Sequence, residues 1–293
     1  MTWRTATREE ITTYYEEEFP TYLDDLPPFI TAGGPKEYAI AFRDPYPVRK
    51  SDVPDKEFIR RATWQTDASG ERTTPQFETI DDVLEFVRHP ARNDPLTGSP
   101  YILADPSLID GLDPSPDAVY YALNHWDRPW IILVDIDAKT IAQNRAEELV
   151  APDDESQSDD VLEAAGIRDA DPVGYPYAFE DVDRAIEYGF AVRDIFEDDF
   201  DADETMVMYT GQGVHVYLLD GDPAHRYDEQ SREVLNDLLL DGYGIPIDPV
   251  VTADRRRVAR LPYSLHAEVC RVVQPIDSPH FDVQSATPER FES

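Results

Sequence analysis

The chain has 293 residues, 41% of them hydrophobic, which is enough for one large α/β domain or two intimate subdomains and argues against a disordered acidic protein. Asp and Glu number 61 against 26 Lys and Arg, so the net charge of −35 lacks the basic character usual for a nucleic-acid enzyme. A single cysteine, Cys270, excludes an internal disulfide. The sequence contains no run of about 18 apolar residues and no signal-peptide segment, so we expect a cytoplasmic protein with no membrane span.

The first half of the chain mixes helical and strand-like patterns. Apolar residues spaced three to four apart predict helices, and alternating or continuous apolar runs predict strands. In chain order we predict a helix at 8–19, a strand at 37–43, a helix at 79–88 and a buried strand at 130–136. In the first helix, Ile11, Tyr14 and Tyr15 share one face.

The second half begins with an acidic, Pro- and Gly-rich stretch at 151–176 that predicts a surface insertion. The further predicted elements are a helix at 181–199, strands at 205–209 and 214–219, a helix at 231–241, strands at 257–261 and 271–276, and a polar C-terminal tail at 278–293. The inward residues of the 181–199 helix are Ile186, Phe190, Ile195 and Phe196. The 231–241 helix carries Val234, Leu235, Leu238 and Leu239, and Gly242 suits its C-cap.

The first chemical motif is Asp135-Ile136-Asp137, at the end of the predicted buried strand. Side chains two apart on a strand share a face, and two carboxylates this close repel each other unless they hold a cation. Mg²⁺ prefers oxygen ligands, and two-metal nucleotidyl transfer needs such a pair. In so acidic a chain, a solvated strand end explains the pair equally well.

The second motif is the turn Thr210-Gly211-Gln212-Gly213, followed by Val214 and His215. Glycines allow a tight turn whose backbone amides face a phosphate, and His215 is then placed to donate to a phosphate oxygen. The alternative is a plain hairpin with a buried histidine that hydrogen-bonds a neighbouring group.

The third motif runs from Asp248-Pro249-Val250-Val251-Thr252-Ala253-Asp254 into Arg255-Arg256-Arg257-Val258-Ala259-Arg260-Leu261-Pro262-Tyr263-Ser264-Leu265-His266. It is the densest basic cluster of the chain, and the planar fork of arginine suits phosphate recognition. Local neutralisation of an acidic surface accounts for Arg255 and Arg256 but poorly for the whole ordered string.

The order of these motifs resembles that of the small catalytic subunit of archaeal and eukaryotic primases. The resemblance runs from about residue 8 to 277, and residues 247–276 are its most specific part. It implies an α/β (mixed α+β) primase catalytic core of two merged α/β units with an RRM-like sheet, spanning residues 1–277.

The resemblance also implies a role for individual residues. Asp135, Asp137 and Asp248 are implied as the catalytic carboxylates that bind Mg²⁺ or Mn²⁺. The implied nucleotide-binding residues are Thr210, Gly211, Gln212, His215, Arg260, His266, Arg271 and Arg49.

Three departures separate the chain from the primase pattern. The family turn reads Ser-Gly-x-Arg-Gly-x-His, whereas residues 210–215 are one residue shorter and lack the arginine, as in plasmid-type primase-polymerases. Ala267-Glu268-Val269-Cys270 replaces the usual Gly-Lys-Thr-Gly. The cysteine zinc element is also missing, so we expect no zinc site.

The sequence therefore predicts a DNA primase, a template-directed nucleotidyltransferase acting on single-stranded DNA with nucleoside triphosphates, with a primase large subunit as a further candidate partner. A primase-polymerase of repair or plasmid replication and a catalytically degenerate module that binds DNA or a partner remain alternatives. A glycosyltransferase with an Asp-x-Asp motif leaves residues 251–266 unexplained.

The acidity predicts an environment rather than a function. Only four lysines are present, at positions 36, 50, 56 and 139. At molar salt the Debye length is about 3 Å, so repulsion between an acidic surface and DNA is screened while close contacts persist. We therefore expect a halophilic protein from a salty cytoplasm.

Overall fold

The computed structural model combines helices with antiparallel sheets, which confirms the mixed α/β class. It describes residues 3–31, 38–42, 58–59, 65–66, 72–73, 79–81, 84, 116–122, 131–149, 177–220, 227–254 and 258–291. Two compact units are formed, and each draws on three separate stretches of chain. Unit 1 contains Met1–Thr5, Asn124–Arg257 and Val273–Thr287, and unit 2 contains Ala6–Leu123, Val258–Val272 and Pro288–Ser293.

Unit 1 is built on a four-stranded antiparallel sheet in the order β12-β7-β8-β6. The strands are β6 (Ile132–Asp137), β7 (Thr205–Tyr209), β8 (Gly213–Leu218) and β12 (Gln274–Ile276). The register sets His215 of β8 between Asp135 of β6 and Met208 of β7. The predicted strands at 130–136, 205–209 and 214–219 are thus confirmed.

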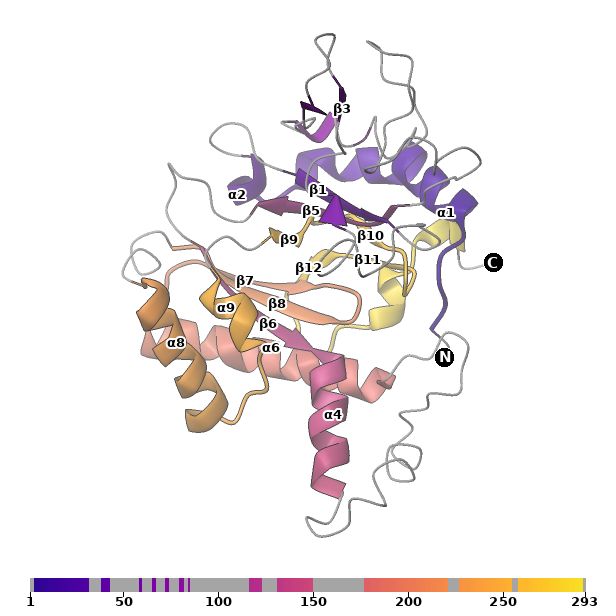
Figure 1. Cartoon of the computed structure of the whole chain (residues 1–293). Coiled ribbons are helices and arrows are strands. Elements are labelled where there is room, and N and C mark those ends of the chain that lie inside the picture. Colours follow the sequence, from indigo (N-terminus) through magenta and orange to yellow (C-terminus); the bar gives the residue numbers. More distant parts are fainter. Residues whose placement is uncertain are drawn as a thin grey trace. The chain divides into compact units, whose positions relative to one another are not determined.

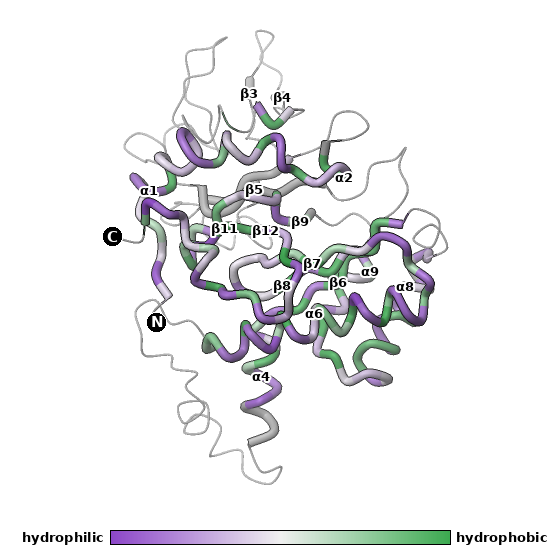
Figure 2. Tube along the Cα trace, turned by 180° about the vertical axis from the view of Figure 1, so that it is seen from behind, coloured by the Kyte–Doolittle hydropathy of each residue, from purple (hydrophilic) through white to green (hydrophobic). Residues whose placement is uncertain are grey.

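The helix α6 (Phe179–Asp199) lies along one face of this sheet, and α4 (Ala138–Leu149) follows β6, packs against α6 and projects away from the sheet (Figure 1). Period-two alternation sends Ile132, Val134 and Ile136 of β6 into the core beneath them. The four inward residues predicted for α6 are all buried, and Figure 2 shows the alternating hydrophilic and hydrophobic stretches of this amphipathic helix. Asp135 and Asp137 therefore lie on the opposite face of the sheet.

The start of α6 is tied to α4 by one acidic residue. Asp181 accepts a hydrogen bond of 2.8 Å from the backbone amide of Ala178 and pairs with Arg145 of α4 at 3.1 Å. The Asp181 side chain is only 2% exposed, so its charge is neutralised inside the unit.

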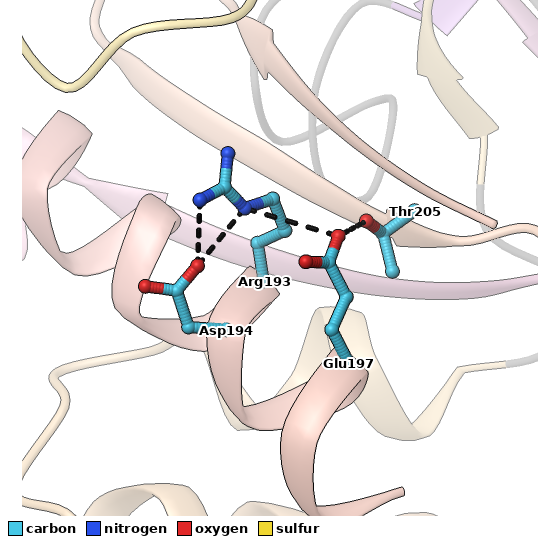
Figure 3. A network of polar contacts seen from close by, with 4 residues as sticks. All are labelled: Arg193, Asp194, Glu197 and Thr205. Atoms are coloured by element: carbon cyan, nitrogen blue, oxygen red, sulfur yellow. Dashed lines mark hydrogen bonds and ion pairs between the residues drawn. The ribbon is translucent and has the colours of Figure 1, made fainter. Parts of the chain in front are cut away.

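The outer face of α6 joins β7 through the polar network in Figure 3. Arg193 pairs with Asp194 at 2.6 Å, and its Nε lies 3.9 Å from Glu197. The hydroxyl of Thr205, at the start of β7, donates to Glu197 at 2.5 Å. These groups are partly exposed, so the network links α6 to β7 without contributing much to the free energy of unfolding.

The helix predicted at 231–241 is formed by α8 (Glu229–Asp237) and a π-helical turn, η5 (Leu238–Gly242). Of its four apolar residues only Leu235 and Leu239 are buried, whereas Val234 is 62% and Leu238 38% exposed. We predicted that Gly242 caps the C-terminal end of this helix. The glycine in the left-handed conformation is instead Gly244, with φ of +67°.

Unit 2 contains the N-terminal helical segment and a second four-stranded antiparallel sheet in the order β2-β1-β5-β9. Its helical elements are α1 (Arg8–Thr13), η1 (Tyr14–Glu18), η2 (Phe19–Asp25), α2 (Pro28–Thr31) and η7 (Glu289–Phe291). Its strands are β1 (Tyr38–Phe42), β2 (Phe58–Ile59), β3 (Gln65–Thr66), β4 (Arg72–Thr73), β5 (Pro116–Ala122), β9 (Val258–Arg260), β10 (Leu265–His266) and β11 (Arg271–Val272). As predicted, Ile11, Tyr14 and Tyr15 are buried together.

Two C-terminal predictions need restating. The run 271–276 is not one strand, because β11 belongs to unit 2 and β12 to unit 1. The predicted polar tail includes a 3₁₀ turn, η6 (Val283–Ala286), and η7, and three apolar side chains of these turns are buried. Residues 278–287 therefore belong to unit 1 and residues 288–291 to unit 2.

Other predictions fall on residues outside the described part. They include the insertion at 151–176 and most of the helix at 79–88. No helix among the described residues is long and apolar enough to cross a membrane.

Candidate functional site

The two acids of the Asp-x-Asp motif occupy the last half of β6. Ile136 between them is fully buried in the core of unit 1, so the alternation of the strand turns both carboxylates to the other face. The side chain of Asp135 is 17% exposed, and that of Asp137 is also partly buried. The predicted shared face is therefore present.

Asp248 lies beside this pair although it is remote in sequence. Its backbone amide donates a hydrogen bond of 2.8 Å to the carbonyl oxygen of Asp135. Asp248 is also the N-cap of α9 (Pro249–Ala253), where its Oδ1 accepts from the amides of Val250 at 2.9 Å and Val251 at 3.2 Å. Pro249 at the first helical position favours a helix start at this point. The backbone of Asp248 is thus held beside Asp135 of β6, whereas its carboxylate caps its own helix.

The chemistry of these donors fits Mg²⁺ or Mn²⁺, because all three side chains offer carboxylate oxygens. Within the described ranges, no group of three or more His, Cys, Asp or Glu side chains is arranged to hold a metal ion. The Oδ1 atom of Asp248 is instead directed to the first amides of its own helix.

His215 faces Asp135 directly across the β6–β8 ladder. Its Nε2 lies 3.6 Å from Oδ1 of Asp135, and its Nδ1 lies 3.1 Å from the hydroxyl of Tyr217. The ring is buried, with 8% exposure. The sequence is compatible with a phosphate contact or with a histidine bonded to neighbours, and in the structure the neighbours of His215 include Tyr217 and the predicted metal-binding Asp135.

The glycine-rich turn fits tightly against the end of β6. Gly211 has φ of +100°, and the amide of Thr210 closes the turn on the carbonyl of Gly213 at 3.0 Å. A Cβ on Gly213 would lie 2.1 Å from the carbonyl oxygen of Ile136, so only glycine permits this approach. The carbonyl of Gln212 accepts from the amide of Ala138, the first residue of α4, at 3.0 Å. The turn is thus packed directly against the strand that carries the Asp-x-Asp motif.

The remaining nucleotide-binding candidates that the structure describes lie in unit 2. Arg260 ends β9 and is partly buried, whereas His266 and Arg271 are buried and face each other across the β10–β11 pair. Nη1 of Arg271 donates to the carbonyls of Val269 at 3.3 Å and Cys270 at 2.9 Å, so it stabilises the turn of its own hairpin. A joint role of these residues with the acids of unit 1 stays a prediction.

Arg49 and the basic run 255–257 lie outside the described residues.

Two further buried residues contact His215 or the elements that carry the acids, and neither was predicted from the sequence. Tyr217 is fully buried beside His215, and its position two residues further along β8 was the available signal. Arg232 of α8 is only 1% exposed, and nothing in its sequence context distinguishes it from a surface arginine.

No protein-family model matches the chain, and no curated protein matches it. Among solved structures, the polymerase domain of ligase D from Mycobacterium tuberculosis, in complex with DNA, is similar to it. The identity is 15%, the TM-score is 0.39, and the match covers 94% of this chain and 85% of that one. A likeness of this degree does not identify a family.

Proposed function

We propose that the chain is a template-directed nucleotidyltransferase that acts on single-stranded DNA, of the primase kind. The observation that supports the proposal is the backbone hydrogen bond that holds Asp248 beside Asp135, whose carboxylate lies 3.6 Å from His215. A distant acid brought next to the Asp-x-Asp strand, beside a glycine-rich turn, fits a site for metal and triphosphate better than a solvated strand end.

Each group has a distinct part in the proposed reaction. The carboxylates of Asp135, Asp137 and Asp248 would hold divalent ions, which would supply Lewis acidity for nucleotidyl transfer. His215 orients Asp135, because the ring is itself fixed by Tyr217. The glycine-rich turn offers close backbone approach to phosphate. In unit 2, Arg260 and His266 are the candidates for holding the triphosphate.

The proposal is tested by nucleotide incorporation on single-stranded DNA in molar KCl with Mg²⁺ or Mn²⁺. We expect incorporation by the wild type and its loss in Asp135→Ala. Asp241→Ala is the matched control, because Asp241 is an exposed acid in η5. Equal incorporation by the wild type and Asp135→Ala would overturn the site assignment.

Primer dependence separates the finer assignments. Incorporation without a primer indicates a primase, whereas extension only from a primer indicates a polymerase of repair or plasmid replication. The same assay with ribonucleotides, deoxyribonucleotides and a candidate large subunit defines the substrates and the partner.

A second candidate function is a degenerate module that binds DNA or a partner without catalysis. It is favoured by the use of the Asp248 carboxylate as a helix cap and by the absence of a three-residue metal-holding group among the described residues. DNA binding by a folded protein that incorporates no nucleotide with either metal would support this reading.

A further inference from the structure

Arg232 is one of the largest fully buried side chains of unit 1, although it carries a charge. Its guanidinium donates to three backbone carbonyls: Nε to Tyr227 at 3.3 Å, Nη1 to Thr252 at 3.4 Å and Nη2 to Ile131 at 3.2 Å. Burying an arginine is costly unless its donors are engaged, so the geometry of these acceptors is tightly constrained.

The carbonyls reached by Nη1 and Nη2 belong to the two elements that carry the acids. Ile131 directly precedes β6, which bears Asp135 and Asp137. Thr252 is in α9, which begins at Asp248. The planar fork of one side chain therefore spans from β6 to α9, and a lysine, which is a single point donor, cannot span both.

A second residue of α8 continues the contact. Asn236 follows Arg232 by four residues, so both lie on one helical face. Its Nδ2 donates to the carbonyl of Pro249 at 2.8 Å, directly next to Asp248 in the chain. One face of α8 is thus hydrogen-bonded to both ends of α9, at Pro249 and Thr252, and to Ile131, the residue before β6.

We propose that Arg232, assisted by Asn236, is a positioning residue that sets the separation of Asp248 from Asp135 and thereby the affinity of the site for a divalent metal. This inference rests on the proposed function. Asp248 and Asp135 are linked to each other by one backbone hydrogen bond of 2.8 Å. Helix α8 contacts the chain on either side of that bond: Arg232 and Asn236 bond α9, and Arg232 also bonds the residue before β6.

The experiment measures Mn²⁺ binding by the full-length protein in molar KCl, from the electron paramagnetic resonance signal of free Mn²⁺. Asp135→Ala defines the binding that belongs to this site. Arg232→Lys keeps the charge and loses the fork, Asn236→Ala removes only the bond to Pro249, and Arg193→Met is the control in the network on α6. Circular dichroism identifies the temperature at which all variants are folded.

We expect the Asp135-dependent affinity for Mn²⁺ to fall about tenfold in Arg232→Lys, which is the effect known for outer-shell partners of metal ligands. The affinity should fall less in Asn236→Ala and should not change in Arg193→Met. Wild-type affinity in a folded Arg232→Lys overturns the inference. If Arg232→Lys does not fold, Asn236→Ala decides, and unchanged affinity there overturns it. Equal Mn²⁺ binding by the wild type and Asp135→Ala instead removes the proposed function on which the inference rests.

Discussion

The backbone amide of Asp248 donates a 2.8 Å hydrogen bond to the carbonyl oxygen of Asp135. This bond links the start of α9 to the middle of β6, so the two acids stay adjacent whatever their side chains bind. The side chain of Asp248 can therefore be changed while its backbone contact is retained.

The cap and the charge of Asp248 are separable by mutation. Asparagine is as good an N-cap as aspartate, so Asp248→Asn keeps the stability of α9 and removes the carboxylate. Asp248→Ala removes both, and we expect it to cost about 1 kcal/mol of unfolding free energy. Urea unfolding and nucleotide incorporation check the pair. Both variants are expected to lose incorporation, and full activity in Asp248→Asn would show that no metal needs this carboxylate.

Gly213 is predicted to tolerate no side chain. The Cβ of Gly213→Ala would lie 2.1 Å from the carbonyl oxygen of Ile136, so β6 and β8 must separate beside Asp137. We expect a loss on the order of 1–3 kcal/mol in the free energy of unfolding, together with reduced incorporation.

Gly244→Ala is the matched control for this clash, because Gly244 has φ of +67° but nothing within 4 Å of its added Cβ. It is expected to show only the strain of the left-handed conformation, about 1 kcal/mol, and unchanged incorporation. A Gly213→Ala variant as stable as Gly244→Ala would contradict the close approach.

Cys270 occupies a position that favours glycine. Its φ is +55°, it is fully buried, and it ends the turn between β10 and β11 where the primase pattern has glycine. Cys270→Gly and Cys270→Ala both remove the sulfur, so their difference isolates the backbone conformation. We expect the glycine variant to be more stable than the alanine variant by about 1–2 kcal/mol in urea unfolding. The reverse order would mean that the turn relaxes away from φ above zero.

Glu18 is predicted to make stability depend on pH. Burial, and then the charge of Glu289, raise the pKa of Glu18 above its usual 4.5, while a hydrogen bond with Tyr22 lowers it. A raised carboxyl pKa means that the folded state binds the proton more tightly, so ionised Glu18 destabilises the fold at neutral pH. That penalty disappears as the pH falls through the raised pKa toward 4.5.

The test compares Glu18→Gln with the wild type by thermal unfolding between pH 7 and pH 4. The variant is expected to be more stable at pH 7, with a difference that vanishes near pH 4. Glu16→Gln, at an exposed position two residues away, should show no such trend. If the stability difference between Glu18→Gln and the wild type were the same at every pH, the ionisation of Glu18 would not be the cause of that difference.

Strong periodicity made part of the fold predictable. The inward face of α6 and the alternation of β6 each depend on one continuous segment. Ile186 and Phe190 could therefore be assigned to the core, and Asp135 and Asp137 to one shared face of the strand, without a structure. The run 205–219 likewise predicted the β7–β8 hairpin.

The errors arise where tertiary packing decides. In α8 the apolar residues 234, 235, 238 and 239 span more than one face, and the pattern does not reveal that only Leu235 and Leu239 turn inward. The partners of Arg232 are backbone carbonyls of other elements, which no side-chain pattern encodes. The position of Asp248 depends in the same way on a backbone bond to a distant strand.

The interleaved composition of the two units bears on how the protein is made. The sheet of unit 2 is completed by β9 at residues 258–260, and that of unit 1 by β12 at residues 274–276. Synthesis from the N-terminus therefore leaves the two sheets incomplete until β9 and then β12 have been made. An emerging chain exposes two unfinished strand edges at once, which makes a ribosome-associated chaperone most valuable before these two strands have left the ribosome.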